Sequence, residues 1–114
     1  MTTESILAHH LQAFGEGIDA ILSDYTEESV LFTPNGPLRG LDGIRAFFAN
    51  FLHNSPPELL QALRVTHQDV AGEAAYILWQ AVPFIPLATD TFIVRDDKIM
   101  IQSFAMLAPS PEKS

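Results

Sequence analysis

The sequence contains no cysteine, few basic residues, and no apolar run approaching the ~20 residues needed to span a membrane. Without cysteine there is no disulfide framework, thiol nucleophile or cysteine zinc site, which fits a reducing compartment. Six Lys and Arg against 14 Asp and Glu give a net charge of −8, which argues against binding to nucleic acid or anionic membranes. The N-terminus has no basic segment typical of a signal peptide. We therefore expect a cytoplasmic protein with no nucleic-acid or membrane partner.

The sequence does contain enough apolar side chains for one core, with 47% hydrophobic residues in a chain of 114. Periodicity predicts three helices, at 4–14, 18–25 and 42–52. It predicts five strands, at 30–33, 63–70, 74–82, 89–95 and 99–104. The stretch 58–63 fits a helix as well as a strand, and 34–37 fits a turn.

This order of elements predicts one α+β domain over residues 1–114, with three N-terminal helices packed on a curved, mainly antiparallel sheet. The ordered core is expected to run from about residue 4 to 106. Residues 108–114 are rich in Pro, Ser and charge, so they are expected to form a flexible tail.

A single acid, Asp90, interrupts a strand face that is otherwise apolar. Alternation along the strand places Asp90 on the same face as Phe92 and Val94, which predicts that this face is buried. A buried carboxylate is costly unless it is paired, hydrogen-bonded or protonated. Asp90 therefore either lies in an interior pocket, which is our working hypothesis, or caps backbone N–H groups or faces solvent at a strand end.

Three further polar side chains fall among apolar neighbours. His10 lies within the apolar stripe of the first helix, and Gln80 and Gln102 each interrupt an apolar strand face. The plain alternatives are that His10 is a core residue with satisfied hydrogen bonds and that the glutamines lie at a sheet surface or an interface. If these groups converge with Asp90, they form a mostly apolar cavity with a few polar groups, which is typical of a small-molecule site.

Two stretches of the chain resemble a known family. They are "GIDAILSDYTEESVLFTPNGPLRGLDGIRAFFANFL" (17–52) and "TDTFIVRDDKI" (89–99). Together with the order of elements, they resemble the SnoaL-like branch of the nuclear transport factor 2-like superfamily, from about Glu4 to Met106. The resemblance implies a cone-shaped α+β barrel that encloses a pocket and is usually dimeric. Because the superfamily includes ketosteroid isomerases, polyketide cyclases, epoxide hydrolases, dehydratases and non-catalytic proteins, the fold does not select an activity.

The resemblance also assigns roles to individual positions. It places Asp90 where ketosteroid isomerases have a protonated Asp in the oxyanion hole, His10 where they have a Tyr, and Tyr25 near a supporting hydroxyl. Thr33 stands where those isomerases have their Asp base, so steroid isomerisation by that mechanism is not expected. The Arg-Asp-Asp set of the epoxide hydrolases is not found. SnoaL-like cyclases use an acid on the sheet with a polar partner, a role that Asp90 and His10 could fill.

Two functions remain open from the sequence. The first is an isomerase, cyclase or hydrolase-type enzyme that acts on a compact apolar carbonyl or cyclic metabolite, with Asp90 and His10 as catalytic residues. The second is a non-catalytic module that binds a hydrophobic ligand or a protein partner. The predicted pocket is lined by Phe14, Tyr25, Thr33, Phe47, Leu78, Gln80, Val82, Phe92, Gln102 and Phe104.

The sheet face opposite the pocket is predicted to be an interface. Trp79, Ile93 and Ile101 are expected on this face, where no helix covers them, so we expect a homodimer through it. The alternative is that the C-terminal tail or the "PFIP" loop at 83–86 covers them. The four His, at positions 9, 10, 53 and 67, have no zinc-motif spacing, and we expect neither a metal nor a cofactor.

Overall fold

Residues 2–107, which the computed structural model describes, form helices packed on a six-stranded sheet. The helices are α1 (Thr3–Ala13), α2 (Ile18–Leu22), α3 (Gly40–Asn54) and α4 (Pro57–Ala62). The strands are β1 (Val30–Thr33), β2 (Gly36–Arg39), β3 (Leu63–Ala71), β4 (Ala74–Ala81), β5 (Ile85–Arg95) and β6 (Lys98–Leu107). The stretch that fitted either helix or strand is helical, as α4. The predicted flexible tail, 108–114, lies outside the described residues.

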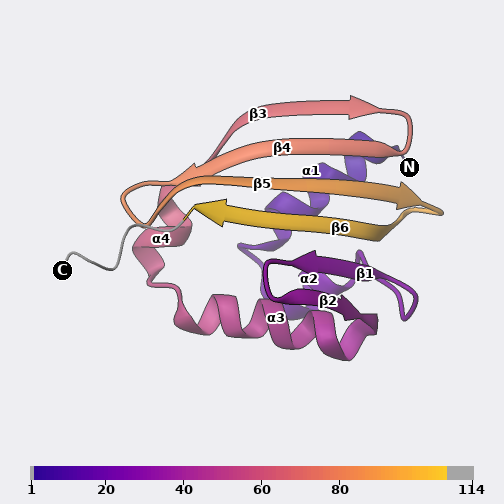
Figure 1. Cartoon of the computed structure of the whole chain (residues 1–114), viewed down its shortest axis with the longest axis horizontal. Helices are drawn as coiled ribbons and strands as arrows, with labels where there is room; N and C mark the ends of the chain where they lie inside the picture. Colours follow the sequence, from indigo (N-terminus) through magenta and orange to yellow (C-terminus); the bar gives the residue numbers. More distant parts are fainter. Residues whose placement is uncertain (1, 108–114) are drawn as a thin grey trace.

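The sheet is mixed and open, with strand order β2-β1-β6-β5-β4-β3. Neighbouring strands are antiparallel except β1 and β6, which run parallel. Figure 1 shows the helices gathered on one side of a curved sheet, where α1 packs against β4 and β5 and α3 against β1 and β2. The predicted α+β class and the curved, mainly antiparallel sheet are confirmed. Within residues 2–107, no helix combines the length and the apolar character needed to cross a membrane.

Local sequence explains where these elements begin and turn. Thr2 caps α1, because its Oγ1 accepts a hydrogen bond from the Ser5 backbone N–H at 3.0 Å. Asp96 and Asp97 both have positive φ, 54° and 64°, which is the backbone of a two-residue hairpin turn between β5 and β6. This tight turn and the one-residue register shift between Ile93 and Val94 together place Asp90 opposite Phe104 on β6.

The first hairpin is longer than the sequence indicated. Pro34 to Pro37 was predicted only as a turn, but the chain returns from that turn as β2, with Leu38 paired with Leu31 on β1. A strand of only four residues is stable at this edge because α3 packs against β2 and covers one side of it. The hairpin therefore supplies one edge of the sheet beside the helices.

The prediction for β4 is wrong about which side chains face the helices. Trp79 faces inward and is buried, because it lies opposite Ala88 on β5 and therefore shares the face that carries Asp90. Three residues predicted to line the pocket do not reach it: Leu78 and Gln80 lie on the outer side of the sheet, and Val82, which follows β4, is exposed. Since this strand is apolar on both faces, alternation alone could not select the buried one.

Candidate functional site

A small cavity of about 60 Å³ lies between the helices and the inner face of β4, β5 and β6. Its wall is almost entirely apolar and aromatic, with three polar side chains, His10, Asp90 and Gln102. Seven of the residues predicted for the site line it: His10, Phe14, Phe47, Asp90, Phe92, Gln102 and Phe104. The other lining residues were not predicted: Leu11, Phe48, Phe51, Leu63, Ile77 and Trp79.

Asp90 is buried and accepts one hydrogen bond on each carboxylate oxygen. Trp79 Nε1–H donates to Oδ1 at 2.7 Å, and Gln102 Nε2–H donates to Oδ2 at 2.7 Å. Burial raises the pKa of Asp90 to about 6, although the hydrogen bonds from Trp79 and Gln102 oppose the shift. Asp90 is therefore a carboxyl group that changes protonation close to neutral pH inside an apolar cavity.

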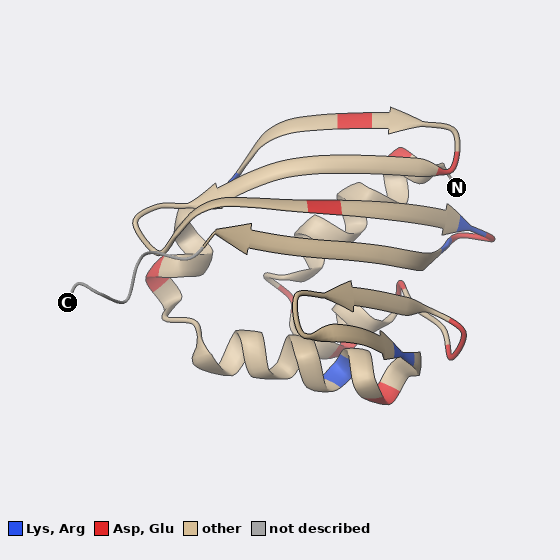
Figure 2. Ribbon diagram, viewed as in Figure 1, with Lys and Arg blue, Asp and Glu red and all other residues tan. Residues whose placement is uncertain are grey.

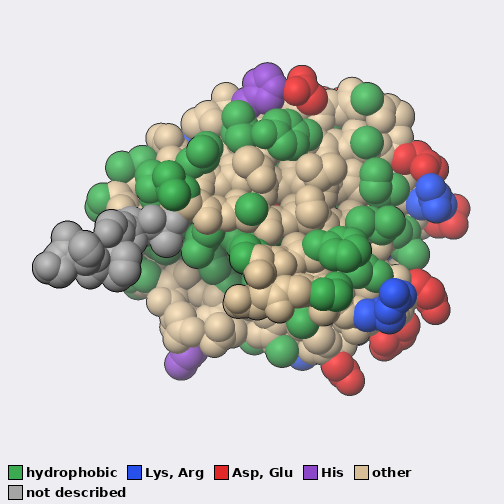
Figure 3. All heavy atoms as spheres, in the orientation of Figure 1, with side chains coloured by type: hydrophobic (Ala, Val, Ile, Leu, Met, Phe, Trp, Pro, Cys, Tyr) green, Lys and Arg blue, Asp and Glu red, His purple; other side chains and the backbone are tan. Residues whose placement is uncertain are grey.

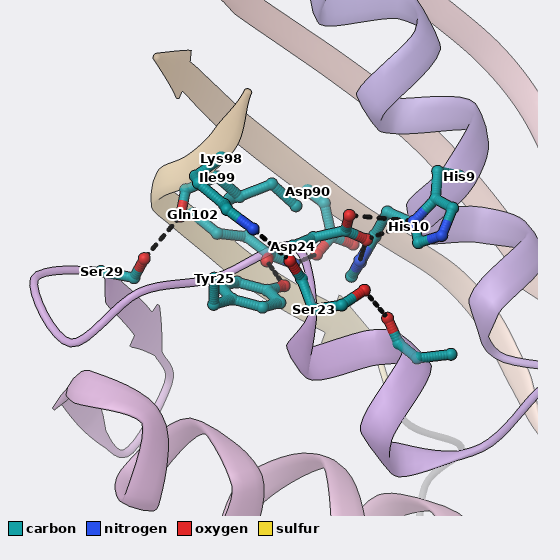
Figure 4. A network of polar contacts seen from close by, with 11 residues as sticks. His9, His10, Ser23, Asp24, Tyr25, Ser29, Asp90, Lys98, Ile99 and Gln102 are labelled. Atoms are coloured by element: carbon teal, nitrogen blue, oxygen red, sulfur yellow. Dashed lines mark hydrogen bonds and ion pairs between the residues drawn. The ribbon is translucent and has the colours of Figure 1, made fainter. Parts of the chain in front are cut away.

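Tyr25 extends this network behind the cavity wall (Figure 4). Its hydroxyl donates a short hydrogen bond to Gln102 Oε1, which leaves the amide N–H₂ of Gln102 to donate to Asp90. Burial, followed by the charge of Asp90, raises the pKa of Tyr25 well above its ordinary value, so the phenol remains a donor. Tyr25 was predicted to line the pocket, but its role is to orient Gln102 rather than to contact the cavity.

His10 lies in the cavity wall, enclosed by aromatic rings. Phe14, Tyr25, Phe48 and Phe92 contact the imidazole edge-to-face, with ring centroids 5.3 to 6.0 Å from it. Burial, together with the neighbouring His9, lowers the pKa of His10 from 6.5 to about 3. His10 is therefore neutral at physiological pH. The sequence predicted His10 as the partner of Asp90, and the structure places both side chains in the wall of one cavity.

A second buried carboxylate, Asp24, lies near Nδ1 of His10 and was not predicted from the sequence. His9 Nδ1–H lies 2.9 Å from both of its oxygens, and His10 Nδ1 lies 3.9 Å from Oδ2. Because 3.9 Å is too long for a hydrogen bond and His10 is neutral, the contact between Asp24 and His10 is not an ion pair. Figure 4 shows Asp24 between the two histidines, with Lys98 approaching from β6. A signal was present, because Asp24 follows Ile21 at a spacing of three within the apolar stripe of the second predicted helix.

Thr33 lies outside the inner cavity, although it was predicted to line the pocket. Its Oγ1 donates to the Gly36 carbonyl at 2.8 Å and accepts from the Asn35 N–H at 3.1 Å. Thr33 thus holds the turn between β1 and β2 and has no acidic group to offer. The position is structural in this chain.

Thr33 instead borders an outer hollow of about 430 Å³. The hollow is lined by Thr33, Pro34, Asn35, Phe47, Asn50, Phe51, Asn54, Ser55, Phe104 and Met106. Three phenylalanines, Phe47, Phe51 and Phe104, line both this hollow and the inner cavity. Their rings therefore form the partition between the two spaces, and none of the residues within 2–107 that line the outer one is charged.

Charge is otherwise kept away from the cavity. Figure 2 shows acidic and basic residues mainly on loops and at the ends of strands, with a single acidic position, Asp90, within the length of β5. In the part of the chain that the structure describes, no group of three or more His, Asp or Glu side chains is arranged to hold a metal ion. The chemistry available in the cavity is therefore that of one carboxyl, one imidazole and one amide.

Comparison with known families now identifies the architecture. A family model described as the SnoaL-like domain matches residues 7–100, most of the chain. The protein belongs to the SnoaL-like domain family. The match confirms the resemblance drawn from the two sequence stretches. A search of curated proteins gave no match.

Solved structures of SnoaL-like and related proteins share the fold of this chain. A protein from Kribbella flavida superposes with a TM-score of 0.75 at 20% identity, covering 90% of this chain and 84% of that one. A putative polyketide cyclase from Sinorhizobium meliloti gives 0.73 at 15% identity, covering 89% and 94%. A hypothetical protein with a ketosteroid isomerase-like fold from Catenulispora acidiphila, in complex with trimethylamine, gives 0.66 at 14%, covering 88% and 83%. At these identities the likeness shows the fold alone.

Proposed function

We propose that this SnoaL-like protein is an enzyme that transfers a proton to or from a compact, mostly apolar molecule bearing a carbonyl or cyclic group. Isomerisation, cyclisation and hydrolysis of such a molecule all use this step. The observation that carries the proposal is the state of Asp90, which lines an apolar cavity with a pKa raised to about 6. A general acid or base works best when its pKa lies near the working pH.

Asp90 is the catalytic residue in this proposal. Both of its hydrogen-bond partners, Trp79 and Gln102, are donors, so they stabilise the ionised carboxylate and hold it in a fixed orientation. When Asp90 is protonated, its O–H is available to the carbonyl oxygen of a ligand in the cavity. The apolar wall strengthens that hydrogen bond because water is largely excluded.

The size of the cavity limits the ligand. A volume of about 60 Å³ is far below the roughly 300–1,000 Å³ of a site for a drug-sized molecule. A larger ligand requires the partition of Phe47, Phe51 and Phe104 to move, which would join the cavity to the outer hollow of about 430 Å³. Phe104→Ala is therefore expected to admit larger ring ketones than the unaltered protein does.

The single tryptophan gives a direct test. Trp79 is the only Trp in the sequence, and its indole N–H donates to Asp90. The protein therefore has one indole signal in a ¹H–¹⁵N spectrum, located at the proposed catalytic group. Adding cyclohex-2-enone or a related small ketone should shift this signal in the unaltered protein.

Turnover is then measured on the ketones that bind. Asp90→Asn should keep the fold but no longer catalyse proton exchange at the ligand carbon next to the carbonyl. NMR in deuterated buffer measures this exchange. Gln68→Glu on the outer strand β3, where Gln68 is exposed, is a control that alters charge elsewhere. If Asp90→Asn exchanges protons as fast as the unaltered protein, the catalytic role of Asp90 is wrong.

A non-catalytic ligand-binding protein of the same fold is the second candidate. The observation that favours it is Thr33, which stands where related isomerases have their base but whose hydroxyl is engaged in the β1–β2 turn, outside the cavity. In that case small ketones shift the Trp79 signal but none undergoes exchange, and Asp90→Asn weakens binding only.

We also propose that two copies of the chain associate through the outer face of the sheet. Ile93 and Ile101 lie on this face as predicted, while Trp79 does not. Phe32 and Ile101, on neighbouring strands, are 46% and 44% exposed, and Figure 3 shows apolar side chains over the strands on one face, with charges mainly at its margin. An apolar sheet face without a covering helix favours self-association.

Sedimentation velocity at micromolar concentration tests the association. The unaltered protein should sediment as a dimer and Ile101→Lys as a monomer, because a lysine would place a charge in the apolar interface. Lys98→Gln, at the start of the same strand, is the matched control and should remain dimeric. A monomer in the unaltered protein contradicts the proposal.

A further inference from the structure

His10 has a buried ring nitrogen that makes no hydrogen bond. Among side-chain nitrogen and oxygen atoms fully enclosed by the described residues, Nδ1 of His10 is the one without a partner. An unpaired buried polar atom is costly and needs a reason. The nearest carboxylate oxygen is Oδ2 of Asp24, at 3.9 Å. Nδ1 therefore faces the one anionic group on its side of the ring.

The charged and titratable groups around His10 come from several elements. His9 precedes it on α1, Asp24 and Tyr25 follow α2, and Asp90 lies on β5. Lys98, on β6, donates to the Ser23 carbonyl at 2.7 Å and lies beside Asp24 rather than beside His10. Tyr25 has its hydroxyl directed at Gln102. On the Nδ1 side of the ring, the nearest carboxylate is that of Asp24.

We propose that Asp24 is a positioning residue that keeps the proton of neutral His10 on Nδ1, so that Nε2 presents a lone pair to the cavity. This rests on the proposed function, since it defines what the cavity binds. In a neutral imidazole one nitrogen donates and the other accepts, and a nearby carboxylate favours the proton on the nitrogen that faces it. Nε2 is not fully enclosed, and the ring lines the cavity.

The cavity then offers one donor and one acceptor. Protonated Asp90 donates to a carbonyl oxygen, and Nε2 of His10 accepts from a second group on the same ligand. The matching ligand class is a neutral hydroxy-carbonyl compound, such as the enol form of a cyclic 1,2-diketone. A ketone without the hydroxyl leaves the His10 lone pair unpaired, and a site built for a hydroxyl discriminates strongly against such an analogue.

The tautomer is measured directly by long-range ¹H–¹⁵N correlation spectra of the histidine rings, with His10 assigned from the signals missing in His10→Gln. At neutral pH the protonated nitrogen of His10 should be Nδ1. A proton on Nε2 in the unaltered protein overturns the proposal, and this arm needs neither a variant nor a ligand. Asp24→Ala should return His10 to a mixture rich in the Nε2–H form. Asp19→Ala, an exposed acid on α2 paired with Arg45, is the matched control and should change nothing.

The ligand class is tested with a matched pair, 2-hydroxycyclohex-2-enone and cyclohex-2-enone, titrated against the Trp79 indole signal. The hydroxylated compound should bind at least tenfold more tightly. In Asp24→Ala, the ratio of the two dissociation constants should be close to one. Equal binding in the unaltered protein overturns the assignment of an acceptor at Nε2. If neither compound shifts the signal while the Nδ1–H tautomer is observed, the ligand class and the proposed function are wrong and the positioning role of Asp24 stands.

Discussion

Two buried carboxylates, Asp24 and Asp90, lie near His10, and they differ in what surrounds them. Asp90, on β5, is held by Trp79 and Gln102, which carry no charge at any ordinary pH. Asp24, after α2, is held by His9, whose side chain is 42% exposed. Burial raises the pKa of both acids, and for Asp24 the hydrogen bond and charge of His9 oppose the shift.

The difference shows how one residue type serves two purposes within a single small core. Asp90 has only neutral hydrogen-bond donors, so its protonation state depends on the cavity and on any ligand bound there. Asp24 has His9 as its hydrogen-bond partner, and the side chain of His9 reaches solvent. The first arrangement suits proton transfer to a ligand, and the second suits a fixed charge that orients a neighbour.

The largest expected effect concerns His10, the buried imidazole near the two acids. Its pKa is lowered from 6.5 to about 3, so the stability that neutral His10 contributes is present above pH 6.5 and is lost as the pH falls toward 3. Between about pH 7.5 and about pH 4, the unaltered protein should lose about 3 kcal/mol more than His10→Phe. Urea unfolding followed by circular dichroism measures this. If the free energy of unfolding changed with pH equally in the two proteins, His10 would not be buried as a neutral ring.

The next effect has the opposite sign and belongs to Asp90. Its pKa is raised from 3.8 to about 6, so its contribution is fully present below pH 3.8 and is lost as the pH rises through 6. Relative to Asp90→Asn, the unaltered protein should therefore lose about 2 kcal/mol between about pH 4 and about pH 7.5. The Trp79 indole signal should titrate with the same midpoint. A midpoint near that of an exposed Asp would contradict the assignment.

A smaller effect is expected from Trp79→Phe, which removes the donor to Asp90 Oδ1 and keeps an aromatic ring in the cavity wall. Loss of a hydrogen bond to a charged group should destabilise the protein by about 1.5 kcal/mol when Asp90 is ionised, and by less when it is protonated. The same substitution made in Asp90→Leu supplies the control, since leucine offers no acceptor to the indole and the double-mutant cycle then isolates the pair. An equal loss in both backgrounds would assign the effect to packing alone.

The smallest effect is expected at the margin of the Asp24 site. Lys98 Nζ donates to the Ser23 carbonyl at 2.7 Å on the surface, so Lys98→Gln should cost only about 0.5 kcal/mol. Thermal unfolding at low and high salt measures it, and salt should reduce the difference. A loss comparable to that of Trp79→Phe would show that the Asp24 site depends on Lys98 as strongly as Asp90 depends on its donor.

Asp90 and His10 were predictable because each is the lone polar side chain in a clear periodic pattern. Alternation along β5 and the helical stripe of α1 each define a buried side, and the polar residue stands out against it. The aromatic wall was partly predictable for the same reason. The fold class followed from the order of helices and strands and from the resemblance to SnoaL-like proteins.

Other features arise from pairing across the molecule and have no signal in a single segment. Trp79 lies on a strand that is apolar on both faces, so only its register against β5 brings the indole N–H to Asp90. The outer hollow is formed where the β1–β2 turn, the end of α3 and β6 meet. Neither the register nor this meeting point is set by local periodicity.

The parallel pairing of β1 with β6 joins the first third of the chain to its last strand. The hydrogen bonds from Tyr25 to Gln102 and from the Ile99 N–H to the Asp24 carbonyl also join these two parts of the chain. Contacts between such distant segments form late in folding, because closing the long loop between them costs chain entropy before the contacts can stabilise the fold. During synthesis, Asp90 emerges from the ribosome before Gln102 does. The polar network is thus assembled only when the final strand has been added, and a chain that stops short of β6 would have its acid without its amide.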